Sequence, residues 1–180
     1  LLETLSIMNS LILSPESLTA ENFSQFGQVI SCEQKDYMLI NNGYAKKYPD
    51  LVSIDTQEND GSTAVHIYVA KKRVFPLQIK MLEKHPFFSQ TFIPKHNQPF
   101  LVVVAPASDE PNIENIRAFI SNGEQGVNYS RGVWHFPLIS IKDDAQFIVI
   151  DRKHVIDSDD IEQCIVHPIE DTNITLEFSL

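Results

Sequence analysis

Glu83 and His85 have residue types and a spacing that could do chemistry at the end of a β-strand. Side chains alternate between the two faces of a strand, so one face should carry Leu77, Ile79, Met81, Glu83 and His85. Three of these are apolar, which predicts that the face points into the core. A carboxylate and an imidazole directed inward can converge on one metal ion or substrate, and burying them without such a partner would be costly. Gln90 follows Pro86 and is placed to return to the same region.

A plainer interpretation of this segment is also available. His85-Pro86 could simply form a turn that ends the strand, with Glu83 reaching into solvent. Taken alone, the segment favours this second interpretation, so a functional prediction needs support from elsewhere in the chain.

Residues 122–137 supply that support through His135. Three glycines in this segment permit tight backbone turns, and Gly132 precedes the only tryptophan, Trp134. A histidine beside a tryptophan is more often a core residue than a ligand. Here, however, the order Ser130-x-Gly132-x-x-His135 resembles the second cupin motif, in which a turn glycine presents an inward-facing histidine.

The first segment resembles the first cupin motif. Glu83-x-His85 stands where that motif has two histidines, and Gln90 stands near its glutamate. The resemblance implies that a divalent metal ion, if one is bound, would be held by Glu83, His85, Gln90 and His135. Imidazole and carboxylate oxygen suit many divalent ions, so these ligands do not select one. No organic cofactor is expected.

Beyond the cupin motifs, the chain resembles the ureidoglycolate lyase family of allantoin degradation. The shared stretches occur in the family's order and comprise residues 26–30, 40–43, 82–86, 90–94, 117–120, 122–129, 133–135, 137–138 and 150–152. An isolated His-Pro or Trp-His pair would mean little, whereas this ordered set is specific. The resemblance implies a cupin-type β-barrel that forms a homodimer and cleaves ureidoglycolate to glyoxylate and urea.

Three residues are predicted to be catalytic. Cleavage of ureidoglycolate resembles the collapse of a carbinolamine, in which a base removes the hydroxyl proton and the leaving urea nitrogen gains one. His85 or His135 is expected to fill this acid–base role, because imidazole titrates near the working pH. Glu83 would orient the imidazole, share in proton transfer or ligate a metal.

Five residues are predicted to contact the substrate, namely Gln90, Arg117, Gln125, Asn128 and Tyr129. Arg117 would bind the substrate carboxylate, although it could equally form a structural ion pair at the surface. Gln125, Asn128 and Tyr129 would bond the ureido group or, with equal weight, satisfy backbone groups of their loop.

The chain departs from the family at three of its positions. Many relatives have an arginine in the strand before Glu83, where this chain has Val69 or a neighbouring residue, and Arg73 is the nearby residue that could compensate. Some bacterial relatives carry histidines at the positions of Ser130 and Phe136. These departures bear on the fine contacts to the substrate, whereas Glu83, His85, Gln90 and His135 are all present.

The rest of the chain predicts a mainly β, cupin-like antiparallel barrel with one or two short helices. Strand-like runs between turn signals cover residues 63–70, 77–83, 100–105, 117–120, 138–141 and 146–150, with an edge strand near 174–178. Short helices are expected at residues 19–27, with Thr19 as N-cap, and at 112–116 after Pro111. Residues 41–43 predict a tight turn, and residues 157–162 predict an acidic loop.

Composition excludes several classes of protein. The 180 residues fit one domain, with residues 1–7 preceding a candidate start at Met8. A net charge of -10 argues against nucleic acid as a partner, and Lys71-Lys72-Arg73 is interpreted as a solvated turn. The 2 cysteines lack a partner motif, which fits a reducing cytoplasm, and no apolar run is long enough for a membrane span.

Three rival functions remain open at this stage. Another cupin enzyme is the first, although Glu83 and Gln90 replace two residues of the usual histidine-rich ligand set. A non-catalytic ligand-binding cupin is the second. A ureidoglycolate amidohydrolase, which would release ammonia instead of urea, is the third, but no two-metal ligand set is visible in the sequence.

Overall fold

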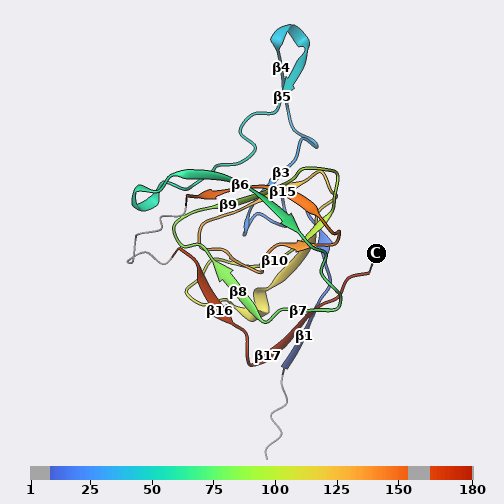
Figure 1. The fold of residues 1–180 in the computed structure, drawn as a ribbon, viewed down its shortest axis with the longest axis vertical. Helices are drawn as coiled ribbons and strands as arrows, with labels where there is room; N and C mark the ends of the chain where they lie inside the picture. Colours follow the sequence, from blue (N-terminus) through green and yellow to red (C-terminus); the bar gives the residue numbers. More distant parts are fainter. Residues whose placement is uncertain (1–8, 154–162, 180) are drawn as a thin grey trace, which may run out of the picture.

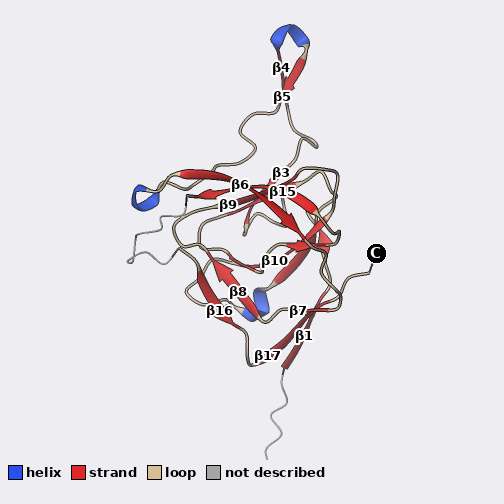
Figure 2. Ribbon diagram, in the orientation of Figure 1, coloured by secondary structure: helices blue, strands red, loops and turns tan. Residues whose placement is uncertain are grey.

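The computed structural model describes residues 9–153 and 163–179, and strands dominate this part of the chain (Figures 1 and 2). Two sheets face each other. The seven-stranded sheet contains β16 (Ile165–Pro168), β8 (Met81–Lys84), β13 (Trp134–His135), β10 (Phe100–Ala105), β11 (Arg117–Ile120) and β2 (Glu16–Ser17), with β14 (Ile139–Ser140) also paired to β10. The five-stranded sheet contains β3 (Gly27–Ile30), β12 (Gly126–Tyr129), β9 (Gln90–Pro94), β15 (Ala145–Arg152) and β6 (Thr63–Ala70).

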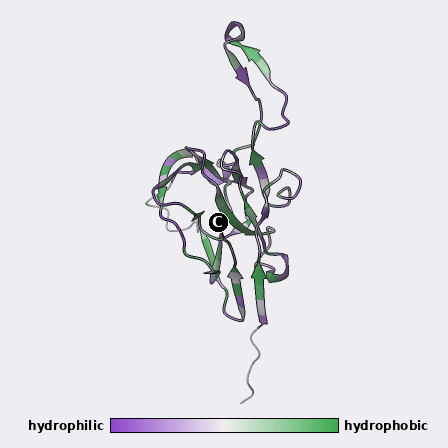
Figure 3. Cartoon of the chain, turned by 90° about the vertical axis from the view of Figure 1, so that its right-hand side faces the viewer, coloured by the Kyte–Doolittle hydropathy of each residue, from purple (hydrophilic) through white to green (hydrophobic). Residues whose placement is uncertain are grey.

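Two smaller units complete the fold. A three-stranded sheet of β1 (Asn9–Leu13), β17 (Thr172–Leu176) and β7 (Leu77–Gln78) packs against the body. A hairpin of β4 (Met38–Ile40) and β5 (Ala45–Lys47) projects away from it, and Figure 3 shows one apolar and one polar strand. Three short 3-10 turns are present at η1 (Asn41–Gly43), η2 (Glu58–Asp60) and η3 (Ile113–Asn115).

Strand β10 shows how the sheets share the core. Its alternate residues Val102 and Val104 belong to a first apolar cluster, which lies between the two large sheets. The intervening Leu101 and Val103 belong to a second apolar cluster on the other face of the seven-stranded sheet, together with residues of β1 and β17. Because side chains alternate between the two faces of a strand, β10 contributes to two separate cores.

The predicted fold class is confirmed as mainly β. Apart from two parallel pairs, β1 with β17 and β11 with β2, the strands pair antiparallel. The sheets do not close into a continuous barrel and instead form a jelly-roll-like sandwich. In the described part of the chain, no helix is long and apolar enough to cross a membrane.

The predicted strands are largely confirmed. The runs at residues 63–70, 100–105 and 117–120 coincide with β6, β10 and β11, and those at 138–141 and 146–150 with β14 and β15 to within two residues. The predicted C-terminal strand is β17, but it lies between β1 and β7 and is not at an edge. The predicted turn at residues 41–43 is confirmed as η1, where Asn42 adopts a φ of 55°. Residues 1–8 and the acidic loop at 157–162 lie outside the described residues.

The helix predicted at residues 19–27 is wrong. The segment forms successive turns, in which Phe23 N–H donates to Thr19 O and Phe26 N–H donates to Phe23 O. A helix this short has little intrinsic stability, and burial of Phe23 and Phe26 determines its path instead. Gly27 then begins β3, where a Cβ would lie 1.9 Å from Asn128 O, so this close approach requires glycine. The second predicted helix is present only as η3, capped by Asn112.

The predicted shared face of residues 77–85 is also wrong. The strand is interrupted between β7 and β8, and Ile79 N–H donates to Ile174 O of the three-stranded sheet. As a result Leu77, Ile79 and Met81 all pack with the second cluster, where the buried Leu82 also lies. Glu83 points to the opposite face of β8 from Leu82. Its inward direction therefore does not come from a face shared with Leu77, Ile79 and Met81, as the prediction assumed.

Candidate active site

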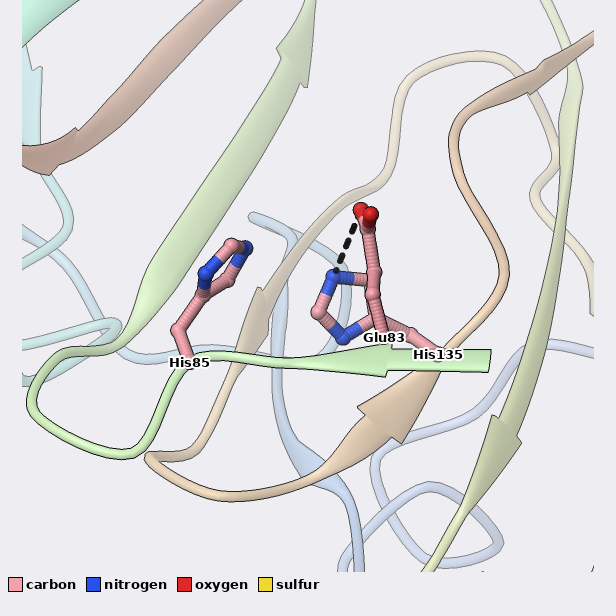
Figure 4. A group of neighbouring side chains, drawn as sticks. All are labelled: Glu83, His85 and His135. Atoms are coloured by element: carbon pink, nitrogen blue, oxygen red, sulfur yellow. Dashed lines mark ion pairs between the residues drawn. The ribbon is translucent and has the colours of Figure 1, made fainter. Parts of the chain in front are cut away.

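Strands β8 and β13 bring Glu83 and His135 together. The two residues are directly opposite in the antiparallel pairing of these strands, and His135 also pairs with Val104 of the first cluster. His85 follows the end of β8, where its carbonyl accepts a hydrogen bond from Gly132 N–H at 2.9 Å. Gly132 has a φ of 76°, a conformation that favours glycine and turns the chain into β13. Figure 4 shows the three side chains directed into the same space.

The three side chains are close enough to share one ligand. His135 Nε2 lies 3.5 Å from Glu83 Oε1, and one ligand atom from each of Glu83, His85 and His135 lies within 4.8 Å of the others. The His135 side chain is 2% exposed and that of Glu83 is 22% exposed. The predicted convergence of the two sequence segments is therefore present in the structure, with access from solvent on the Glu83 side.

Both imidazoles point Nε2 into this space. His85 Nδ1 lies 3.0 Å from Gln163 O, and His135 Nδ1 lies 3.0 Å from Val133 O. A carbonyl oxygen only accepts, so each Nδ1 carries the proton and donates it. The two Nε2 atoms are buried and have no hydrogen-bond partner. Histidines that hold metal ions show this same arrangement, with the second ring nitrogen bonded to a carbonyl or carboxylate.

The electrostatics of this cluster call for a cation. A lone pair on His135 Nε2 would face a carboxylate oxygen at 3.5 Å, and either a proton on Nε2 or a bound metal ion would relieve the repulsion. Burial raises the pKa of Glu83, but the close contact and charge of His135, with the charge of His85, outweigh it and leave the pKa below 4.5. Burial and the His135 charge lower the pKa of His85 below 6.5, so His85 stays neutral near neutral pH.

Aromatic rings hold both imidazoles in place. The ring of His85 stacks on Phe88 with centroids 4.5 Å apart, and that of His135 stacks on Tyr129 at 4.6 Å. Burial, with a contribution from the Glu83 charge, raises the pKa of Tyr129 well above its usual value of 10.0. The Tyr129 hydroxyl therefore stays protonated and is available as a donor.

Gln90 leads to polar residues that the sequence interpretation missed. Its Nε2 donates to Asp151 Oδ2 at 3.2 Å, while Asp151 Oδ1 lies 3.0 Å from His66 Nε2. The charge of Asp151 also acts on His85. Alternation along β15 places Asp151 on the same inward face as Val149 and Phe147, a signal that could have identified it.

Cys164 was missed as well. Its Sγ donates to Glu83 Oε2 at 3.8 Å, because the segment before β16 pairs alongside β8. Nothing in the sequence around Cys164 indicates this neighbour, since 81 positions separate the two residues. A thiol therefore borders the exposed side of the cluster.

Three of the predicted substrate residues are engaged elsewhere. Arg117 forms a two-point ion pair with Glu16, with distances of 3.0 and 2.7 Å. The Gln125 side chain bonds Asn122 N–H and Leu18 O, and that of Asn128 bonds residues on the outer face of the five-stranded sheet. The structure thus brings Tyr129 to the histidines, directs Gln90 to Asp151, and leaves the other three with structural partners.

Two of the departures from the family lie away from the cluster. Val69 is 60% exposed, on the face of β6 opposite to Tyr68. Phe136 is buried in the second cluster. Neither side chain shares the face of His135.

A hollow of about 620 Å³ lies along the edge of β6. One wall comprises residues 68–73 and the other comprises Pro137 and Leu138, which follow His135 closely in the chain. Its volume falls within the range of small-molecule sites, about 300–1,000 Å³. A hollow of about 480 Å³ beside Phe75 and Glu177 has no lining residue that is close to His135 in the chain, so it is a poorer candidate.

Two facing antiparallel sheets, with a carboxylate and two imidazoles from adjoining segments, define a protein of the cupin class. The family model described as ureidoglycolate lyase matches residues 10–173. Ureidoglycolate lyases of Azotobacter vinelandii and Pseudomonas paraeruginosa are each 48% identical, covering 78% of this chain and 85% and 83% of theirs. The chain therefore belongs to the ureidoglycolate lyase family, which confirms the resemblance found in its sequence.

A solved structure, the rmlC epimerase of Mycobacterium tuberculosis, has a TM-score of 0.41 and 10% identity, covering 74% of this chain and 65% of that one. A likeness this low adds no argument about fold or function.

Proposed function

We propose that this protein cleaves ureidoglycolate to glyoxylate and urea in allantoin degradation. Membership of the ureidoglycolate lyase family supports this reaction. The observation that carries the proposal is the pair of buried Nε2 atoms, on His85 and His135, that lack a partner beside the Glu83 carboxylate. A buried polar atom without a partner is costly, and such atoms collect where a ligand completes them.

In this proposal the two histidines move the protons. His85 is neutral near neutral pH, so its Nε2 accepts the proton of the substrate hydroxyl. The carbon–nitrogen bond then breaks, glyoxylate forms, and the urea nitrogen takes a proton from His135 Nε2. Glu83 stabilises the protonated His135 through their 3.5 Å contact. Transfer of the proton from His85 to His135, whose ring centroids lie 5.2 Å apart, restores both residues for the next cycle.

Glu83, His85 and His135 also fit a divalent metal ion. Their ligand atoms lie within 4.8 Å of one another, and both histidines present Nε2 with Nδ1–H bonded to a carbonyl, as metal ligands do. A bound ion would polarise substrate oxygens and stabilise negative charge on them. Gln90 stands apart from this set because its amide bonds Asp151.

Tyr129 and Gln90 are the two predicted substrate contacts that we retain. The Tyr129 hydroxyl stays protonated beside His135 and can donate to the ureido carbonyl. Asp151 holds Gln90 Nε2, which fixes the amide so that its carbonyl oxygen can accept a ureido N–H. We propose that Arg117, Gln125 and Asn128 have structural roles instead. Arg117 forms an ion pair at the surface, and the two amides bond neighbouring groups of the protein.

The proposal includes a cytoplasmic homodimer. Val65, Ile67 and Val69 leave an apolar stripe on the outer face of β6, with exposures of 67%, 54% and 60%. Met38 and Leu39 of the projecting hairpin are also exposed. Ile67→Glu should convert a dimer into a monomer, as measured by sedimentation velocity. A wild-type monomer at micromolar concentration would contradict this part of the proposal.

Product analysis tests the reaction directly. Purified protein is incubated with ureidoglycolate, and glyoxylate, urea and ammonia are measured with and without a chelator. Equal amounts of glyoxylate and urea without ammonia are expected. Ammonia as the nitrogen product, or no turnover after supply of each divalent ion in turn, would overturn the proposal.

A further inference from the structure

A cluster of positive charge lines the hollow beside β6. Lys71, Lys72 and Arg73 follow this strand directly and form part of one wall of the 620 Å³ space. The chain as a whole carries a net charge of -10, so its average field repels small anions. A local group of cations at a hollow is therefore the feature of this molecule best suited to attract one.

The backbone holds these cations in position. Arg73 N–H donates to Ser140 O at 2.8 Å, and Lys72 N–H donates to Asp143 Oδ1 at 3.1 Å. These bonds tie the segment to the neighbourhood of β14, on the far side of the hollow. The sequence predicts only a solvated turn here, because the sequence alone does not indicate these long-range bonds.

Two of the three cations are available to a ligand. Lys72 Nζ lies 3.9 Å from Asp143 Oδ2, whereas neither Lys71 nor Arg73 has an ion pair with any residue in the described ranges. The Arg73 guanidinium lies over the Phe136 ring, 5.8 Å from its centroid. Stacking of this kind leaves the edge of the guanidinium, with its N–H groups, open for a carboxylate.

The hollow lies beside the catalytic cluster. Tyr68 lines it and also packs inward, with its ring centroid 6.0 Å from that of Phe92. The Phe92 ring in turn lies 5.8 Å from that of Tyr129, which stacks on His135. On the opposite wall, Pro137 is two residues beyond His135. One wall thus continues the segment that carries His135, and the other is connected to it through the packed ring of Tyr68.

We propose that Lys71 and Arg73 form the carboxylate-recognition site for the substrate, a small 2-hydroxy or 2-oxo acid anion, at the mouth of the hollow. Arg73 binds the carboxylate through paired N–H donors, and Lys71 attracts the anion into the hollow. The identity of the anion as ureidoglycolate rests on the proposed function, whereas the anion site rests on the cations and the hollow. This assigns to Lys71 and Arg73 the role that sequence reasoning gave to Arg117.

Charge-removing variants test this site. Arg73→Gln and Lys71→Gln are compared with Lys47→Gln, which removes an equal charge from the projecting hairpin. Arg73→Gln should raise KM for ureidoglycolate about tenfold or more, with kcat within about twofold, because a charge-assisted hydrogen bond to the bound anion is lost. Lys71→Gln should flatten the fall of kcat/KM with added salt, and Lys47→Gln should match the wild type.

Direct binding separates this inference from the proposed reaction. Glyoxylate is titrated into each protein by calorimetry, and Arg73→Gln should weaken its binding about tenfold or more. A wild-type protein that binds glyoxylate through Arg73 but does not cleave ureidoglycolate would overturn the reaction and support the site. An active wild type whose KM and glyoxylate affinity are unchanged by Arg73→Gln and Lys71→Gln would overturn the site.

Two further results distinguish loss of the anion site from misfolding and from a general effect of net charge. Arg73→Lys keeps the charge and should give an affinity between those of the wild type and Arg73→Gln, provided that circular dichroism shows unchanged folding. If Lys47→Gln weakens glyoxylate binding as much as Lys71→Gln, the effect belongs to net charge and the site is overturned.

Discussion

Trp134 and His135 are neighbours on β13, and they show how differently the two apolar clusters are used. Trp134 is 1% exposed and lies in the second cluster, where its Nε1 donates to Ser108 O and Lys84 Nζ sits over its ring. His135 is 2% exposed and faces the first cluster, where its Nε2 has no hydrogen-bond partner. One side chain has every polar group satisfied, and the other retains a polar atom for a ligand.

The contrast extends across both clusters. The second cluster is covered by the three-stranded sheet, and the indole N–H of its Trp134 is bonded to Ser108 O. The first is apolar around Phe100 and Phe147 but gives way to Glu83, His135 and Asp151 at its other end. Unsatisfied buried polarity is costly to a fold, and in the described part of the chain it is found on His85 and His135 at this end and on Arg152, which follows Asp151. The two histidine atoms face the Glu83 carboxylate, which marks this end as the place where a ligand binds.

Replacement of His135 by alanine should give the largest effect on function. The variant removes the proposed proton donor, so kcat should fall about 10²–10⁴-fold while the thermal unfolding transition stays close to that of the wild type. Steady-state kinetics and circular dichroism measure the two quantities. His96→Ala, in an exposed loop, is the matched control and should be fully active. A His135→Ala protein with wild-type turnover would remove this residue from the mechanism.

Replacement of Trp134 by alanine should have the opposite signature. Loss of a fully buried tryptophan from the second cluster should lower the free energy of unfolding by about 3–5 kcal/mol, as measured by urea denaturation. The molecules that remain folded should keep their KM. If Trp134→Ala raised KM without loss of stability, the separation between the two clusters would be wrong.

The pKa shifts of His85 and Glu83 in the first cluster should shape the pH dependence of activity and contribute to that of stability. The pKa of His85 is lowered below 6.5, so in the folded protein this base stays neutral as the pH falls through 6.5. The unfolded chain takes up a proton on His85 in that range, so His85 makes the folded state progressively less stable from pH 6.5 down to its folded pKa. Glu83, whose pKa is lowered, stabilises the fold above pH 4.5 and loses that effect as the pH falls through its folded pKa.

Profiles of kcat/KM between pH 4.5 and 8 measure this behaviour. The acid limb of the wild type should lie below pH 6.5, the usual imidazole value. An acid limb centred above pH 6.5 would contradict the assignment of His85 as the neutral base.

Arg117→Gln should have the smallest effect. Its ion pair with Glu16 is half-exposed, so its loss should cost no more than about 1 kcal/mol of stability. KM for ureidoglycolate should change less than about twofold, because the guanidinium already binds Glu16 and Asn22 O. A tenfold rise in KM would return Arg117 to the substrate site and weaken the case for Arg73.

Much of the fold could be predicted from local patterns. Runs such as 63–70 and 100–105 alternate or are continuously apolar between turn residues, and they form β6 and β10 at the predicted positions. The segment at 19–27 misled because its helix-like spacing is too short to be decisive, and burial of Phe23 and Phe26 prevailed. Residues 77–83 misled because pairing with β17 interrupts the strand, an interaction that no local pattern reveals.

The sequence by itself determined the chemistry of the site, because residue type decides which groups can bind a metal or move a proton. It identified Glu83, His85 and His135 through ordered motifs, and these three converge in the structure. Only the tertiary structure decided their surroundings. Asp151 and Cys164 reach the site, and the cations at 71–73 reach their hollow, through strand pairing and loop anchoring over 60 or more positions. Such distant contacts depend on the packed whole.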